Sequence, residues 1–149
     1  MSSNDQAPFH AGGTAVWDIA PGVAAFLKAH VKPGMRTIET GAGRSTLMFT
    51  EAGAVHTVVT PSTNEQSRIL AEAARLGLDT KTLTFAIGYS QQVLPTLDGP
   101  LDMALIDGGH GFPIPAIDWA YIAPRLVVGG LLLIDDVDLW TGSMLVDFL

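Results

Sequence analysis

Short apolar runs alternate along this chain with segments that have the pattern of helices, and this alternation limits the possible folds more than any other feature. The runs expected to be strands are "RTIET" at 36–40, "VHTVVT" at 55–60, "TLTFAI" at 82–87, "LDMALID" at 101–107 and "GLLLID" at 130–135. Strands that are apolar almost throughout and are separated by helices form parallel sheets with both faces covered. The sequence therefore predicts a doubly wound α/β fold.

Several helix boundaries follow from capping and stop residues. A helical pattern over 14–31 is interrupted by Pro21 and Gly22, which predicts two short helices that meet there. After the second strand, Ser62 is a suitable N-cap, and Glu65 three residues later completes a capping box. Gly77 is placed to end that helix. The segment 41–53 is expected to begin as a glycine turn and continue as a helix, and further helices are expected at 90–97, 113–126 and from 139 onward.

The length and composition indicate one folded domain. A chain of 149 residues can build one core but is too short for two ordinary domains. We expect a single domain over 1–149, with N-terminal helices at about 14–31 and the core sheet at about 36–136. No apolar run approaches the ~20 residues of a membrane helix. The N-terminus lacks the pattern of a signal peptide, so we expect a cytoplasmic protein without a membrane partner.

Two further properties narrow the function. The chain has no cysteine, which excludes disulfides, thiolate zinc sites and a cysteine nucleophile. Its net charge of -7 argues against a nucleic-acid partner, because proteins that bind phosphate backbones normally carry a basic surface. The expected partner is a small molecule.

Acidic residues stand where the predicted strands end. Asp107 ends the fourth strand and is followed by His110, while Asp135 and Asp136 end the fifth strand. Parallel strands present their carboxyl ends at one edge of the sheet, and ligands bind there. One such acid could simply cap the next helix. Several acids and a histidine at the same edge favour a functional site.

The first strand ends in Glu39 and the turn "TGAGRST". Gly41 and Gly43 allow a tight turn from strand to helix and a close approach to a ligand. A dinucleotide fingerprint would require glycine at Thr46 and an acid at the end of the second strand, and neither is present. A pyrophosphate would also be repelled by Glu39. A nicotinamide-dependent oxidoreductase is therefore disfavoured.

Three segments together resemble a known family: "TIETGAGRSTL", "LDMALIDGGHGFPIPAIDW" and "GGLLLIDDVDLWTG". They are similar to class I S-adenosylmethionine-dependent methyltransferases, and most similar to the bacterial group with an Asp-Gly-x-His pattern after the fourth strand. The resemblance covers the chain from about Gly13 to its end. It implies a Rossmann-like methyltransferase fold, S-adenosylmethionine as cofactor, and methyl transfer to an oxygen of a small hydroxylated molecule.

The resemblance also implies which residues contact the cofactor. They are Glu39, Gly41, Gly43, Ser45, Thr60, Tyr89, Ser90 and Asp107. Two positions depart from the family. Thr60 and Pro61 stand where an acid usually holds the ribose, and "GYS" stands in place of "GDS" near the adenine. A non-catalytic domain that keeps the fold and binds partners therefore stays open as an alternative.

A metal-dependent branch of the superfamily suggests how methyl transfer could be assisted. Asp107, Asp135 and Asp136 fall on positions that bind magnesium there. Oxygen ligands with open positions suit Mg²⁺, which would lower the pKa of an acceptor hydroxyl. His110 and Asp107 are the expected catalytic residues, with His110 taking the proton. The alternative is that the acids are strand caps and no metal binds.

The C-terminal half leaves two further expectations. Asp118 lies in the predicted helix over 113–126 and is expected to be solvated or ion-paired. The family adds a helix and an antiparallel pair of strands after the fifth strand, and here the sequence stops near the end of that helix. The fifth strand is thus expected at an open edge of the sheet, which another chain could cover in a homodimer.

Overall fold

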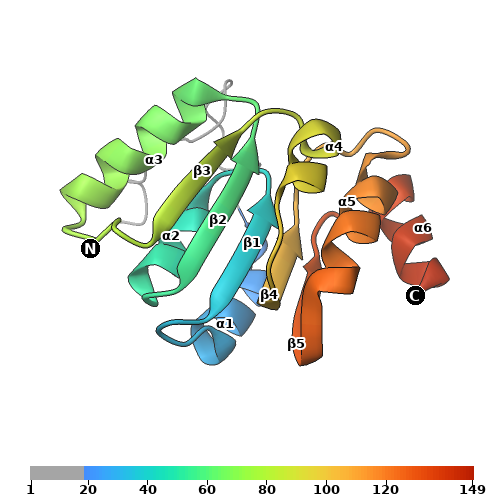
Figure 1. Cartoon of the computed structure of the whole chain (residues 1–149), viewed down its shortest axis with the longest axis horizontal. Coiled ribbons are helices and arrows are strands. Elements are labelled where there is room, and N and C mark those ends of the chain that lie inside the picture. Colours follow the sequence, from blue (N-terminus) through green and yellow to red (C-terminus); the bar gives the residue numbers. More distant parts are fainter. Residues whose placement is uncertain (1–18) are drawn as a thin grey trace.

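The computed structural model describes residues 19–149, and within them five parallel strands form one sheet in the order β3-β2-β1-β4-β5. The strands are β1 (Arg36–Thr40), β2 (Val55–Thr60), β3 (Leu83–Ile87), β4 (Leu101–Ile106) and β5 (Leu126–Ile134). The order reverses between β1 and β4, which are hydrogen-bonded neighbours in the middle of the sheet (Figure 1). This confirms the doubly wound α/β fold.

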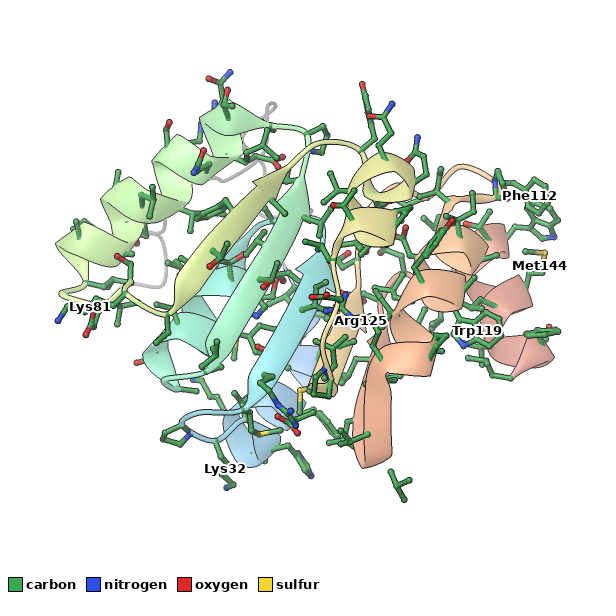
Figure 2. All side chains as sticks on the ribbon, viewed as in Figure 1. Lys32, Lys81, Phe112, Trp119, Arg125 and Met144 are labelled. Carbon is green, nitrogen blue, oxygen red and sulfur yellow. The ribbon has the colours of Figure 1, made fainter. Side chains whose placement is uncertain are left out.

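Helices cover both faces of the sheet. They are α1 (Pro21–His30), α2 (Arg44–Glu51), α3 (Thr63–Arg75), α4 (Ser90–Val93), α5 (Ile114–Ile122) and α6 (Trp140–Phe148), with 3-10 turns η2 (Leu94–Thr96) and η3 (Ala123–Arg125). Leu27 and Phe49, from α1 and α2, pack with Leu105 of β4 on one face. Ile122 and Leu145, from α5 and α6, pack against the other. Trp119 of α5 meets the ring of Phe148 edge-on at 5.3 Å (Figure 2).

Backbone hydrogen bonds continue past the strand ends and bring the following residues together. The amide of Asp107 donates to the carbonyl of Thr40 at 3.1 Å, and that of Asp135 donates to Ile106 at 3.0 Å. The amide of Gly41 donates to Val59 at 2.9 Å. The residues that follow β1, β4 and β5 therefore meet at one edge of the sheet, as the sequence predicted.

Helix α3 begins and ends as its capping residues predicted, with one difference. The hydroxyl of Ser62 accepts the amide of Glu65 at 3.1 Å. Gly77, with φ +70°, ends the helix, and the amide of Leu78 donates to the carbonyl of Ala73. The carboxylate of Glu65 does not complete the capping box, because it accepts instead from the hydroxyl of Thr60.

Other boundaries differ more from the expectation. Helix α1 begins at Pro21, and the helix expected before it lies outside the described residues. Strand β5 begins at Leu126 rather than Gly130, because a bulge containing Gly129 (φ +82°) lets the pairing with β4 continue. β5 forms one edge of the sheet, and Val128 on it is exposed. No helix within residues 19–149 is long and apolar enough to cross a membrane.

Candidate functional site

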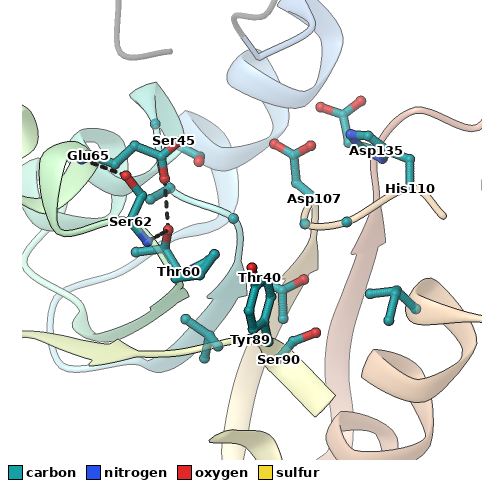
Figure 3. Close-up of a pocket in the computed structure, with 18 of the residues that line it drawn as sticks. Thr40, Ser45, Thr60, Ser62, Glu65, Tyr89, Ser90, Asp107, His110 and Asp135 are labelled. Atoms are coloured by element: carbon teal, nitrogen blue, oxygen red, sulfur yellow. Dashed lines mark hydrogen bonds between the residues drawn. The ribbon is translucent and has the colours of Figure 1, made fainter. Parts of the chain in front are cut away.

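A cavity of about 670 Å³ lies at the carboxyl ends of β1 and β4, where the strand order reverses (Figure 3). It is large enough for a nucleoside-sized ligand. Its walls come from the ends of all five strands and the segments that follow them, and are formed by residues 40–45, 59–62, 89–91, 107–110 and 135–136, together with Ile19, Glu65 and Ile114. Of the predicted cofactor contacts, Gly41, Gly43, Ser45, Thr60, Tyr89, Ser90 and Asp107 line it.

Gly41 is required by the way the two central strands approach each other. Its φ is +86°, a conformation that residues with a side chain rarely adopt. A Cβ atom there would lie 2.1 Å from the backbone oxygen of Asp107. The glycine therefore lets the turn after β1 pass against the end of β4, which brings Asp107 to the cavity.

Glu39 lies elsewhere than predicted. Its side chain is fully buried and is not part of the cavity wall. Successive side chains of a strand point to opposite faces, so Thr40 lines the cavity while Glu39 points toward α2. There its carboxylate accepts hydrogen bonds from Ser45, Thr46 and His56. Glu39 was predicted to contact the cofactor, and its side chain lies behind the glycine turn rather than on the cavity wall.

Glu65 is a cavity residue that the sequence reasoning missed. It lies in the first turn of α3 and lines the cavity beside Thr60, whose hydroxyl donates to its carboxylate at 2.7 Å. The sequence lacks an acid at the end of β2, but the fold supplies one from the next helix. The capping-box position of Glu65 was the available signal, since it places the residue at the start of a helix that follows a strand end.

The wall near β3 and α4 contains Tyr89 and Ser90, and Asp118 of α5 lies behind it. Tyr89 is largely exposed, so its ring is accessible from the cavity. Asp118 is fully buried and makes no well-formed hydrogen bond, contrary to the expectation of a solvated or ion-paired side chain. Burial raises the pKa of Asp118, and the nearby hydroxyls of Ser90 and Thr40 oppose this shift.

Asp107 has the most perturbed acidity of the cavity residues. Burial, followed by the negative charges of Asp135, Glu39 and Asp136, raises its pKa from 3.8 to about 8. A partly buried carboxyl near other carboxylates favours its neutral form, since ionisation would add a like charge where water is partly excluded. Asp107 therefore carries a proton near neutral pH and becomes ionised when a cation approaches it.

His110 and Asp136 form a pair on the wall opposite Thr60. The imidazole Nε2 lies 3.2 Å from Asp136 Oδ2. Asp136 has a positive φ of 52°, which is uncommon for a residue other than glycine and often marks a functional position. The hydroxyl of Thr141 donates to the backbone oxygen of His110 at 2.6 Å and joins the loop after β4 to α6.

Three of these side chains could together hold a cation. Within the described residues, the ligand atoms of Asp107, His110 and Asp136 all lie within 4.8 Å of one another. Asp135, which was predicted as a metal ligand, is outside this group, and its Oδ1 accepts the amide of Asp136 at 2.9 Å. The predicted set of acids therefore meets only in part, and His110 takes the place of Asp135.

Comparisons with known proteins bear on the family and the fold of the chain. Residues 38–137 match the sequence profile of a family described as "Methyltransferase domain". No curated protein matches the chain in sequence.

Among solved structures, the chain is similar to a precorrin-6Y C5,15-methyltransferase from Geobacter metallireducens, with a TM-score of 0.72 and 16% identity over 91% of this chain and 72% of that one. It is also similar to an rRNA methylase from Streptococcus thermophilus, with a TM-score of 0.66 and 14% identity over 88% and 79%. An SAH-bound methyltransferase from Podospora anserina gives a TM-score of 0.68 and 20% identity over 81% and 55%.

Proposed function

Because the chain belongs to a family of methyltransferase domains and has the class I S-adenosylmethionine-dependent fold, we propose that it transfers the methyl group of S-adenosylmethionine to an oxygen of a small hydroxylated molecule. The observation that carries the proposal is the His110–Asp136 pair, which faces the same cavity as the glycine turn. One cavity thus offers both a cradle for the cofactor and a candidate base.

The cofactor would lie across the carboxyl ends of β1 and β2. Gly41 and Gly43 would contact its methionine and ribose portion, as the family resemblance implies, from the turn that approaches β4 closely, and Ser45 would lie beneath it at the start of α2. We assign the ribose hydroxyls to Glu65 and Thr60, because a carboxylate on that wall can accept from both hydroxyls. Tyr89 would stack on the adenine, with Ser90 beside it.

His110 would accept the proton of the acceptor. A hydroxyl oxygen becomes a good nucleophile only as it loses its proton, and imidazole titrates in the range needed near neutral pH. If Nε2 donates to Asp136, the lone pair of Nδ1 is free to take that proton. The Asp136 carboxylate would then stabilise the imidazolium. The oxygen would form a bond to the methyl carbon as the carbon–sulfur bond breaks, with its electron pair leaving on sulfur.

Mg²⁺ assistance is a second proposal, supported by the grouping of Asp107, His110 and Asp136. The donor set fits a hard cation in part, because two carboxylates are suitable ligands and a protonated Asp107 would ionise beside the charge. Such an ion, when bound, would lower the pKa of an acceptor hydroxyl. His110 would then be a ligand, which would leave it unable to serve as the base.

Calorimetric titration tests the cofactor. Wild-type protein should bind S-adenosylmethionine and S-adenosylhomocysteine but not NAD. Failure to bind either sulfur ligand would favour the non-catalytic alternative, in which the fold is kept for interaction. Preferential binding of NAD would favour the oxidoreductase.

Turnover with a panel of hydroxylated acceptors then tests the base. His110→Ala should lower kcat by about 10²-fold or more without weakening S-adenosylhomocysteine binding. His30→Ala is the matched control, since His30 bonds only to the Phe26 carbonyl on α1 and does not line the cavity. An unchanged kcat in His110→Ala would remove the histidine from the mechanism. Loss of turnover in EDTA, restored by Mg²⁺, would show that the reaction uses the metal ion.

A further inference from the structure

A buried hydrogen-bond network lies directly behind the glycine turn. The carboxylate of Glu39 accepts from the hydroxyls of Ser45 and Thr46, in the first turn of α2, and from Nε2 of His56 at 3.1 Å. All of these side chains are buried. A carboxylate removed from water needs such partners, because an unpaired buried charge is very costly.

The network reaches the cavity through the same two hydroxyl residues. Ser45 itself lines the cavity. The hydroxyl of Thr46 accepts the amide hydrogen of Gly43 at 3.2 Å, and Gly43 is also part of the cavity wall. Glu39 therefore restrains two residues of the wall without facing the cavity itself.

His56 of β2 is the third partner of the carboxylate and packs against α2 itself. Because a carboxylate only accepts, Nε2 carries a hydrogen and donates it. Nδ1 shares a second hydrogen bond of 2.7 Å with the hydroxyl of Thr37, and the ring stacks on Phe49 with centroids 4.2 Å apart. The imidazole is completely buried, so its orientation is fixed on every side.

We propose that His56 is a positioning residue for the cofactor. It holds Glu39, and through Glu39 it keeps the turn at 41–45 in the shape that lines the cavity. This inference rests on the proposed function, because it assumes that the turn binds the cofactor. It also gives a role to a histidine at a buried strand position, where apolar residues are more usual.

The competing explanation is that His56 only fills space in the core. Two substitutions separate the explanations, because each keeps a different half of the side chain. His56→Phe keeps the ring that stacks on Phe49 but loses the donor to Glu39. His56→Gln loses the ring but keeps an N–H group that can donate to the carboxylate.

The measurements are the dissociation constant of S-adenosylhomocysteine by calorimetry and the Tm of each variant. If His56 is a positioning residue, His56→Phe should weaken binding by about tenfold, the effect of about one lost hydrogen bond to a charged group, while His56→Gln stays within about threefold. The variant with the weaker binding, His56→Phe, should not also be the variant with the lower Tm. Weakening in proportion to the loss of Tm in both variants, or wild-type affinity in His56→Phe, would overturn the proposal.

Thr50→Val is the control for a general loosening of α2. The Thr50 hydroxyl donates to the backbone oxygen of Thr46 at 2.8 Å, is buried, and does not touch Glu39. This variant should lose stability and keep its affinity. If it loses affinity as His56→Phe does, the effect comes from the helix and the proposal fails.

A ligand-free measurement keeps the two proposals distinguishable. The amide hydrogen of Gly43 should exchange faster in His56→Phe than in wild type and Thr50→Val, since its acceptor hydroxyl is held by Glu39. Suppose that the Gly43 amide exchanges faster in His56→Phe, but that the wild-type protein does not bind S-adenosylhomocysteine. These two results would support the positioning network and refute the cofactor site. Unchanged exchange would refute the network.

Discussion

Asp107 shows how strongly one residue depends on its surroundings in this protein. Its carboxyl titrates near 3.8 in an unfolded chain and near 8 in the folded one. Between these values the folded state binds more protons than the unfolded state, so the free energy of unfolding falls as pH rises from about 4 to about 8. The group thus opposes folding at neutral pH, a pattern common at functional sites.

Asp107→Asn should reverse this effect, because the amide is neutral at every pH. We expect the free energy of unfolding at pH 8 to rise by several kcal/mol, with little change near pH 4, because the pKa of Asp107 rises from 3.8 to about 8 on folding. Denaturant unfolding followed by circular dichroism at several pH values measures both. The control is Asp79→Asn, whose exposed carboxylate pairs only with Lys81. Equal stabilisation at pH 4 and pH 8 would show that the effect does not come from ionisation of Asp107.

At the scale of the elements, the segments that follow the strands contribute more residues to the cavity wall than the strands themselves. The fold brings Glu65 to the cavity because α3 begins at Thr63, directly after the turn that leaves β2. The start of this helix depends on Ser62, whose hydroxyl caps the amide of Glu65. The cap and the ribose contact proposed for Glu65 therefore depend on the same turn.

Ser62→Ala tests this link. Loss of the cap should cost about 1 kcal/mol of stability, and a frayed first turn should weaken S-adenosylhomocysteine binding severalfold through Glu65. Thermal unfolding and calorimetry measure the two effects. Ser67→Ala is the matched control on the same helix, since the Ser67 hydroxyl only donates to the Thr63 carbonyl on an exposed face. Unchanged affinity of Ser62→Ala for S-adenosylhomocysteine would contradict the proposal that Glu65 binds the ribose hydroxyls.

At the scale of the whole molecule, the cavity draws on segments from one end of the sequence to the other. Its wall includes residues from Ile19 to Asp136, so a ligand bound there would contact segments that lie far apart in the sequence. The far edge of the sheet is different in character, because β5 exposes Val128 and has no strand beyond it within the described residues. The homodimer expected from the sequence would pair at that edge, and this stays a prediction.

A ligand that binds only the folded state should therefore stabilise the entire chain. S-adenosylhomocysteine at 100 times its dissociation constant should add about 2.7 kcal/mol and raise Tm by roughly 5–10 °C. NAD at the same concentration should leave Tm unchanged. Scanning calorimetry with each ligand makes the comparison. Equal shifts from both ligands would contradict a selective cofactor site.

The sequence alone determined the fold class and the edge at which the site lies. Periodic apolar runs and capping residues act locally, so the strands, the Ser62 cap and the Gly77 stop could be predicted from short segments. Parallel pairing then requires Asp107, Asp135 and Asp136 to meet near the turn after β1. Gly41, Ser45 and Tyr89 line the cavity, and their contact with the cofactor stays a prediction.

Only the tertiary structure decided where individual side chains point. Alternation along β1 places Glu39 and Thr40 on opposite faces, but the packing of α2 decides which of them meets the cavity. The backbone at Asp136 turns its carboxylate to His110, and Asp135 stays outside the group. Asp118 is buried because α5 lies against the sheet. Such directions depend on contacts between distant segments, and these are physically absent from any local pattern of residues.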